Sequence, residues 1–289
     1  MRQTRESATN GRLGYPNDAR LLLINADDFG MYPAINAAVV RAYTEGIVRS
    51  TSLMVPCPGA SHAIHLLKDH PEIRFGVHLS IIRDIDSYPW DPLTPKERVP
   101  SLLDGDGSLY RLARMAELLD RAKLDEVEIE FRAQIEAVLA AGPWPTHLDW
   151  HCLYNGGRPD IFDLTLGLAN EYGLALRVDA QPFIDQVQRQ GSPTADHDLL
   201  DSFGIDIEEK AARYAELLRA LPVGLTAWAV HPSLGSAESR AIDPDGWRVR
   251  RTDFDFLMSP QAREIIQREG ITLISYEPLQ RVWQRGSSA

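Results

Sequence analysis

The chain has 289 residues, of which 44% are hydrophobic and 25% are charged, a composition typical of a globular protein with a sizeable core. Its formal net charge of −11 opposes nonspecific binding to nucleic acid and to anionic membrane surfaces. The chain contains no apolar run near the ~20 residues that span a bilayer, and its two cysteines, Cys57 and Cys152, provide neither a disulfide framework nor a metal-ligand spacing.

The N-terminal residues 1–18 are polar and lack the apolar core of a secretory signal. We therefore expect residues 1–18 to form a polar tail and residues 19–289 to form a single domain. One α/β barrel of roughly 250 residues would account for that length. We expect the protein to be soluble and cytoplasmic, and the sequence leaves open whether it assembles into a homo-oligomer.

Four consecutive apolar residues, Leu21 to Ile24, predict a strand that is buried on both faces of a sheet. The strand leads into two adjacent carboxylates, Asp27 and Asp28, and a helix follows with Pro33 in its first turn. Acidic residues at the carboxyl end of a buried parallel strand lie where α/β folds place their active sites. Alternatively, the two carboxylates only end the strand and cap the next helix.

Strand and helix signals then alternate along the chain. Further strands are predicted at 50–55, 75–81, 146–151, 174–178, 225–230 and 271–275, and helices at 34–46, 60–68, 112–141, 160–172, 207–220 and 260–269. The segments 83–108 and 181–204 are predicted to be loops, the first of them a functional cover. On the longest helix, Glu126, Glu130 and Glu136 are expected to face outward.

About seven strand–helix units without a domain-sized linker predict a parallel sheet with right-handed crossovers. Such a chain can form an open doubly wound sheet or an incomplete barrel. Candidate functional residues follow the first, third, fourth and sixth strands, and a closed ring brings the ends of nonadjacent strands to one mouth. We therefore predict an α/β fold, an imperfect TIM-like (β/α) barrel with about seven parallel strands.

Histidines follow the third and fourth strands. His78 ends the third strand, and His147, Asp149 and His151 point to one side of the fourth because the side-chain period of a strand is two. Such a row is costly inside an apolar core, but a metal or a charged network would satisfy its members together. His151 is nearest the carboxyl end and is the expected ligand. His147 lies deeper, and Asp149 could orient an imidazole.

Together with Asp28, these imidazoles would hold a divalent metal and activate its bound water. Asp27 could then accept a proton from the water, and His231, at the end of the sixth strand, could protonate a leaving group. The alternative is that His78 and His231 are hydrogen-bonded core histidines.

The identity of the metal stays open. One carboxylate with two imidazoles suits Zn²⁺, Mn²⁺, Fe²⁺ or Co²⁺, and with extra waters Mg²⁺, so that magnesium or zinc is our expectation. Arg177, near the end of the fifth strand, either grips a substrate hydroxyl or carboxylate or forms a surface salt bridge.

At this point the sequence resembles the YdjC-like carbohydrate deacetylases, also called the ChbG/HpnK family. The resemblance extends from Leu21 to Leu279 and is carried by NADDFG (25–30), GVHL (76–79), THLDWH (146–151), VHPS (230–233) and ITLISYEPL (271–279). It implies an imperfect TIM-like barrel and metal-dependent removal of an acetyl group from N-acetylated sugars. It also implies that Asp27 is the catalytic base, that Asp28, His78 and His151 are metal ligands, and that His231 is the general acid.

The chain departs from the family pattern after its fourth strand. Trp150 replaces a usual serine, and Leu153 and Asn155 stand where further histidines are usual, which changes the rim expected to contact sugar. The primary hypothesis is a hydrolase with a small carbohydrate substrate. The alternatives are a metal hydrolase that acts on a phosphoester or another C–N bond, and a sugar-binding protein without turnover.

Overall fold

A parallel sheet forms the centre of the protein in the computed structural model, which describes residues 7–286. The strands of this sheet are β1 (Arg20–Phe29), β2 (Ser50–Leu53), β3 (Phe75–Leu79), β6 (His147–Trp150), β7 (Ala175–Leu176), β8 (Leu200–Asp201), β9 (Gly224–Val230) and β10 (Ile271–Leu273). They lie in the order β7-β6-β3-β2-β1-β9-β8, and β10 pairs with the first residues of β1. Two further strands, β4 (Ile82–Arg83) and β5 (Tyr110–Arg111), pair with each other in parallel.

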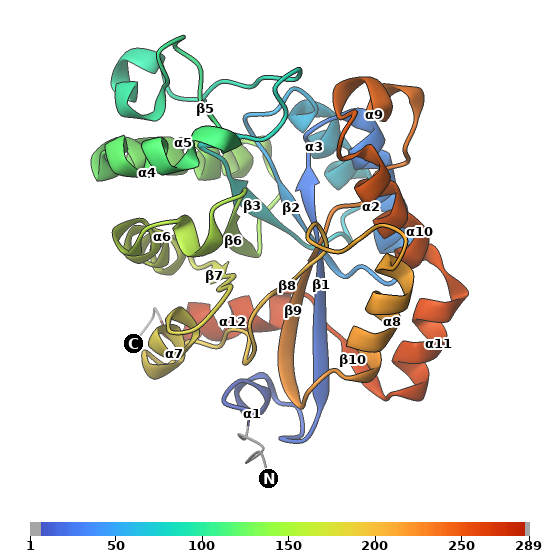
Figure 1. The fold of residues 1–289 in the computed structure, drawn as a ribbon. Helices are drawn as coiled ribbons and strands as arrows, with labels where there is room; N and C mark the ends of the chain where they lie inside the picture. Colours follow the sequence, from blue (N-terminus) through green and yellow to red (C-terminus); the bar gives the residue numbers. More distant parts are fainter. Residues whose placement is uncertain (1–6, 287–289) are drawn as a thin grey trace.

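Helices flank the sheet (Figure 1). They are α1 (Asn10–Leu13), α2 (Pro33–Thr44), α3 (Ala60–Asp69), α4 (Met115–Arg121), α5 (Leu124–Ala141), α6 (Pro159–Tyr172), α7 (Phe183–Arg189), α8 (Lys210–Arg219), α9 (Ala237–Ile242), α10 (Trp247–Met258), α11 (Pro260–Arg268) and α12 (Glu277–Gly286). Single turns of 3₁₀ helix lie at Lys96–Arg98, Pro100–Leu102, Leu112–Arg114 and Tyr154–Gly156. Among these described helices, none has both the length and the apolar composition that crossing a membrane requires.

The sheet curls into a half-barrel (Figure 1), which confirms the predicted imperfect barrel of parallel strands. Its edges are β7 and β8, which do not pair through a ladder within the described residues. The backbone N–H of Leu199, just before β8, nevertheless donates to the carbonyl of Asp179, just after β7, at 2.7 Å. The curvature therefore brings the carboxyl ends of nonadjacent strands to one mouth, as the barrel hypothesis requires.

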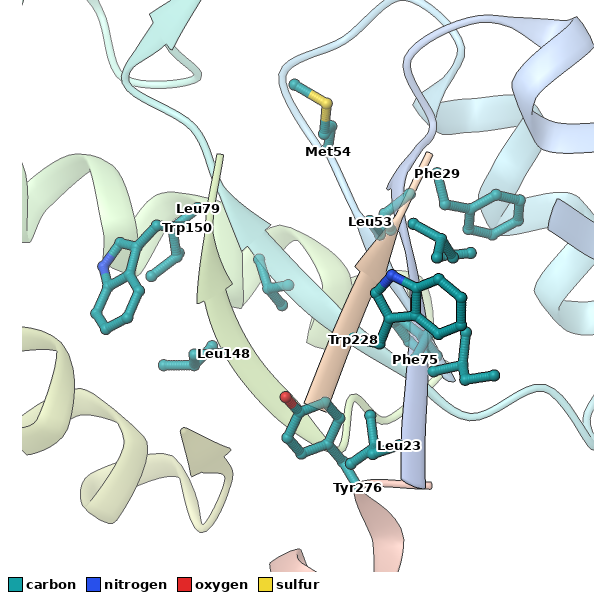
Figure 2. Close-up of a cluster of buried hydrophobic side chains, with 14 of the residues drawn as sticks. Leu23, Phe29, Leu53, Met54, Phe75, Leu79, Leu148, Trp150, Trp228 and Tyr276 are labelled. Atoms are coloured by element: carbon teal, nitrogen blue, oxygen red, sulfur yellow. The ribbon is translucent and has the colours of Figure 1, made fainter. Parts of the chain in front are cut away.

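The core is built on β1, whose residues after Arg20 are all buried. Figure 2 shows a cluster of buried apolar side chains, among them Leu23 and Phe29 of β1, Leu148 on β6 and Trp228 on β9. Fully burying a side chain of this size stabilises the fold by about 1.5–3 kcal/mol. The apolar run predicted from sequence thus forms the central strand.

The N-terminal segment is packed against the domain from residue 7 onward, in contrast to the expected polar tail. Helix α1 lies within it, and Thr9 is buried and donates its hydroxyl hydrogen to the carbonyl of Thr194 at 2.6 Å. The Asn10 amide donates to the carbonyl of Ala19 at 2.9 Å. These polar side chains satisfy backbone groups, a role that composition alone does not indicate. The rest of the expected tail, residues 1–6, lies outside the described residues.

The helix predicted at 112–141 is in fact two helices, α4 and α5. Ala122 and Lys123 have extended backbone between them, with ψ angles of 122° and 135°. Two of the three glutamates expected to face outward are buried as well, Glu126 and Glu130, whereas Glu136 is exposed.

The two buried glutamates on α5 accept hydrogen bonds from the backbone of the segment between β4 and β5. The Glu130 carboxylate accepts the backbone N–H groups of Leu93 and Thr94 at 3.0 and 2.9 Å. Glu126 accepts the N–H of Ser101 at 2.6 Å. The periodicity of a helix predicts that such residues face solvent, because it contains no information about a loop that folds over them.

The second expected loop, 181–204, contains helix α7 and strand β8. Both are short, which makes their periodicity weak. The stretch after β9, for which no element was predicted, forms α9 and α10, and α12 follows β10. Helix α10 is important for the site, because it contributes a buried arginine described below.

Candidate functional site

Both carboxylates at the end of β1 reach one cavity, although consecutive residues of a regular strand point to opposite faces. Asp28 has a left-handed backbone with a φ of 67°, and the pairing of β1 with β2 shifts register between Ala26 and Phe29. Aspartate is among the few residues other than glycine that adopt this conformation readily. The cavity has a volume of about 270 Å³ and is lined by Asp27 and Asp28 and by residues at the ends of other strands.

Three side chains from three strands converge on one point in this cavity. Asp28 Oδ1 lies 3.5 Å from His78 Nε2 and 3.2 Å from His151 Nδ1. With metal–ligand bonds of about 2.1 Å, neighbouring ligand atoms around one cation lie roughly 3.0–3.5 Å apart. One carboxylate and two imidazoles at these separations, all buried, could therefore hold a divalent cation.

Each of the two imidazoles is also bound to a carboxylate through its other nitrogen. Asp149 Oδ1 lies 2.8 Å from His78 Nδ1, and Asp84 Oδ1 lies 3.1 Å from His151 Nε2. Metal-binding histidines are commonly oriented in this way. The Asp149 position agrees with the orienting role expected from sequence. Asp84 follows β4 and was not predicted from sequence.

The surrounding charges make this part of the cavity favourable for a cation. Burial alone would lower the pKa of His78, but Asp149 raises it to about 9. Burial likewise opposes the protonated form of His151, yet the carboxylates of Asp84 and Asp28 raise its pKa well above the usual range. Both rings thus lie in a strongly negative environment.

Arg250, from α10, compensates part of that negative charge. It is 1% exposed, and its guanidinium donates to Asp28 Oδ2 at 2.6 Å and to Asp243 Oδ2 at 3.0 Å. Burial would raise the pKa of Asp28, but Arg250 and the two imidazoles lower it well below its usual range. The Asp28 carboxylate is therefore ionised, with Oδ1 directed at the imidazoles. No sequence signal distinguishes Arg250 from its neighbours Arg248 and Arg251.

Asp27 is held by a second buried arginine. Arg177 donates to both carboxylate oxygens of Asp27, at 2.9 and 2.8 Å, and the amide of Asn25 donates to Oδ1 at 2.6 Å. Arg177 is only 4% exposed, so the surface salt bridge considered from sequence is wrong. Its partner is a buried carboxylate at the end of β1.

His231 lines the same cavity as the imidazole pair. Its Nε2 is 4.0 Å from Asp27 Oδ2, and its Nδ1 is 2.8 Å from the hydroxyl of Ser202. Its backbone N–H donates to Asp253 Oδ2 at 2.8 Å. These contacts fix the ring with one nitrogen facing Asp27.

The alternation predicted for the fourth strand is present in β6 and continues to His151, which lines the cavity, while Asp149 contacts His78 beneath it. His147 lies deeper and stacks on Tyr276, with ring centroids 3.7 Å apart, and burial lowers its pKa. Within residues 7–286, His147 has no ligand atom close enough to those of two other candidate ligands to share a cation with them. A Cβ atom on Gly76 would lie 2.5 Å from the His147 ring, which explains the glycine at this position.

Two of the three residues that depart from the family pattern, Trp150 and Leu153, line the cavity. Trp150 is 2% exposed, and its Nε1 donates to the hydroxyl of Thr165 on α6 at 3.1 Å. The third residue, Asn155, accepts the backbone N–H of Asp179 at 2.9 Å.

Comparison with known proteins agrees with the motifs. The model of the family described as YdjC-like protein matches residues 21–268. A carbohydrate deacetylase of Enterococcus faecalis is 27% identical over 89% of this chain and 97% of its own length. A chitooligosaccharide deacetylase of Serratia marcescens is 29% identical over 90% of this chain and 99% of its own length.

Two further comparisons cover different shares of the chain. A carbohydrate deacetylase of Brevibacillus brevis is 38% identical over 156 residues, which are 54% of this chain and 58% of that protein. A crystal structure from Enterococcus faecalis has a TM-score of 0.78 and 27% identity, and the match covers 90% of this chain and 99% of that one. Since the family model matches most of the sequence, this chain belongs to the YdjC-like protein family.

Proposed function

We propose that this chain is a carbohydrate deacetylase that hydrolyses the acetamido group of an N-acetylated sugar with the help of a divalent cation. The observation that carries the proposal is the position of Asp27. Its Oδ2 lies 3.9 Å from His78 Nε2 and 4.0 Å from His231 Nε2, between the candidate cation ligands and a candidate acid. The full-length similarity to proteins named as deacetylases supports the same reaction class.

The cation would be held by Asp28, His78 and His151, and when bound it would activate water and polarise the amide carbonyl. Asp27 is the base that accepts the proton of the attacking water. Arg177 and Asn25 hold its carboxylate in position. Both oxygens of Asp27 are thus occupied, whereas Arg250 binds only Oδ2 of Asp28 and leaves Oδ1 facing the two imidazoles, where a cation would be held.

His231 is the acid that protonates the departing nitrogen, a step that amide hydrolysis requires because an amine anion is a very poor leaving group. As an acid the ring carries protons on both nitrogens: Nδ1–H donates to the Ser202 hydroxyl, and Nε2–H faces the cavity and passes its proton to the departing nitrogen, which leaves a neutral imidazole. The side chain is 12% exposed at this position, so a substrate atom in the cavity can reach it.

The mouth of the cavity suits a sugar. Tyr154 and Phe203 line it and are 51% and 40% exposed, so that two aromatic rings with apolar faces lie open to a ligand. The Phe203 ring lies 4.6 Å from the His231 ring. A sugar ring packed on Phe203 would therefore carry its acetamido nitrogen close to the proposed acid.

The test is acetate release from N-acetylglucosamine and its oligomers by the purified protein, supplied in parallel with Mg²⁺, Zn²⁺, Mn²⁺ or Co²⁺. We expect release with at least one cation and its loss in a chelator. A generic phosphoester assayed beside them is the control. Phosphoester turnover without acetate release from any sugar would contradict the proposal and favour the other class of metal hydrolase.

A further inference from the structure

His151 presents its two nitrogens to two different sets of ligand atoms. Nδ1 faces Asp28, whereas Nε2 lies 3.1 Å from Asp84 Oδ1 and 3.4 Å from the sulfur of Cys152. One potential ligand atom from each of Asp84, His151 and Cys152 lies within 4.8 Å of the others. This second group differs from the first because it contains a thiol.

We propose that Asp84, His151 and Cys152 form a second cation site, selective for thiophilic cations such as Zn²⁺ or Cd²⁺. Soft sulfur ligands favour these cations, whereas Mg²⁺ requires oxygen ligands. With bonds of about 2.0–2.3 Å to nitrogen, oxygen and sulfur, the three ligand atoms of one such cation lie roughly 3–4 Å apart. The distances from His151 Nε2 to Asp84 and to Cys152 fall within that range.

A cation can reach this site from the cavity. Asp84, His151 and Cys152 all line the space of about 270 Å³ into which Asp27 and Asp28 point. Cys152 is exposed as a residue, while its thiol lies inward beside His151. The other cysteine, Cys57, is 4% exposed and belongs to the apolar core, so only one of the two thiols is placed for this role.

Some charges near the three ligands favour cation binding and others oppose it. The Asp84 carboxylate, 3.1 Å from His151 Nε2, supplies an anionic ligand and favours a cation. Arg250 NH2, 3.8 Å from Asp84, opposes a cation. Binding must release the thiol proton of Cys152, and the Nε2 proton of His151, to solvent as the sulfur and nitrogen bonds to the cation form.

The shared imidazole links the second site to the first. When both are filled, His151 bridges the two cations through Nδ1 and Nε2. The second cation also occupies space in the cavity that, on the proposed function, receives the sugar. An excess of a thiophilic cation is therefore expected to inhibit the enzyme rather than to activate it.

The binding test is a titration with Cd²⁺ in the presence of Mg²⁺, followed by the ultraviolet charge-transfer absorption of cadmium thiolates. We expect the absorption in the wild type and in the matched control Cys57→Ser. In Cys152→Ser we expect it to vanish, or the Cd²⁺ affinity to fall by roughly 100-fold or more. An undiminished absorption in Cys152→Ser, its loss in Cys57→Ser, or its absence from the wild type would overturn the proposal.

Two further measurements separate this site from the proposed activity. Asp84→Asn should weaken Cd²⁺ binding by at least about tenfold, because it removes an anionic ligand while keeping the side-chain shape. A Cd²⁺ affinity of Asp84→Asn equal to that of the wild type would show that Asp84 only orients His151, and it would overturn the three-ligand site. The absorption does not depend on acetate release, so a protein that fails to deacetylate any sugar could still confirm the second site.

Discussion

The two adjacent aspartates at the end of β1 lie in two electrostatically similar but chemically different regions. Asp27 faces the buried guanidinium of Arg177 and Asp28 that of Arg250. Each arginine is surrounded by three carboxylates. Those around Arg177 are Asp27, Asp149 and Asp179. Those around Arg250 are Asp28, Asp84 and Asp243.

The two regions differ in the other side chains that contact the aspartates, which are imidazoles in one region and an amide in the other. The Asp28 region adds two imidazoles, His78 and His151, whose ligand atoms can share a cation with Asp28. The Asp27 region adds Asn25 and faces His231, so its carboxylate is hydrogen-bonded and directed toward a proton donor. Potential ligand atoms of Asp27, His78 and Asp149 also lie near one another, but Arg177 and Asn25 already bind the Asp27 oxygens. We infer that the cation is held beside Asp28 and that Asp27 is kept for proton transfer.

The sharpest test of this division is Asp27→Asn. The amide keeps the shape and an acceptor for Arg177 but cannot take a proton from water, so kcat should fall by roughly 10²–10⁴-fold. Cation affinity, measured by calorimetry, should stay at the wild-type value. Normal turnover on any accepted substrate would remove the base assignment and, with it, the proposed difference between the two aspartates.

The two arginines provide the next test, because removing a buried ionic partner typically destabilises a protein by about 3–5 kcal/mol. We expect losses of this size in the unfolding free energy of both Arg177→Met and Arg250→Met. A divalent cation should restore more stability to Arg250→Met, since it can supply positive charge beside Asp28. Urea denaturation with and without the cation measures the stability that the cation restores. An equal gain in the unfolding free energy of both variants would contradict the proposed difference between the two regions.

Asp28→Asn complements the first substitution. Asparagine also tolerates the left-handed backbone at this position, so the loop can keep its shape while the anionic ligand is lost. We expect cation affinity to fall by at least about 100-fold, beyond the effect of changing a residue behind a ligand. The measurement is the dissociation constant by calorimetry, with Asp27→Asn as the matched control. A dissociation constant equal to that of the control would place the cation elsewhere.

The sequence predicts the parts of this site that lie on regular strands. The apolar run of β1 marks the central strand, and the period of two places Asp149 and His151 on the same side of β6. His78 and His231 follow strands whose existence the pattern also indicates. In these cases local periodicity and the barrel rule are sufficient, because the ends of parallel strands meet at one mouth.

Residues that reach the site from irregular or distant segments could not be found in this way. Asp84 follows a two-residue strand, and Arg250 lies on α10 between other arginines. Their roles depend on which loops and helices fold over the mouth, a property of the tertiary structure. The buried Glu126 and Glu130 were misplaced for the same reason, because the segment that covers them has no periodicity of its own.

Asp179 gives the most specific test, since it is one of the three carboxylates around Arg177 and is the one whose pKa is raised. Burial raises its pKa to about 6 despite Arg177, and Asp149 and Asp27 add to the shift, whereas Asp84 beside His151 has a lowered pKa. The folded protein therefore holds this proton more tightly than the unfolded chain, where the pKa of aspartate is about 3.9.

The stabilisation from that proton is complete below about pH 4 and is lost as the pH rises through about 6. Asp179→Asn mimics the protonated acid and can still accept the N–H of Asn155. The variant should match the wild type near pH 4 and exceed its unfolding free energy by roughly 3 kcal/mol above pH 7. Urea denaturation across this range measures the difference. A difference that stays constant with pH would mean that Arg177 does balance all three carboxylates, and the two regions would then be electrostatically equivalent.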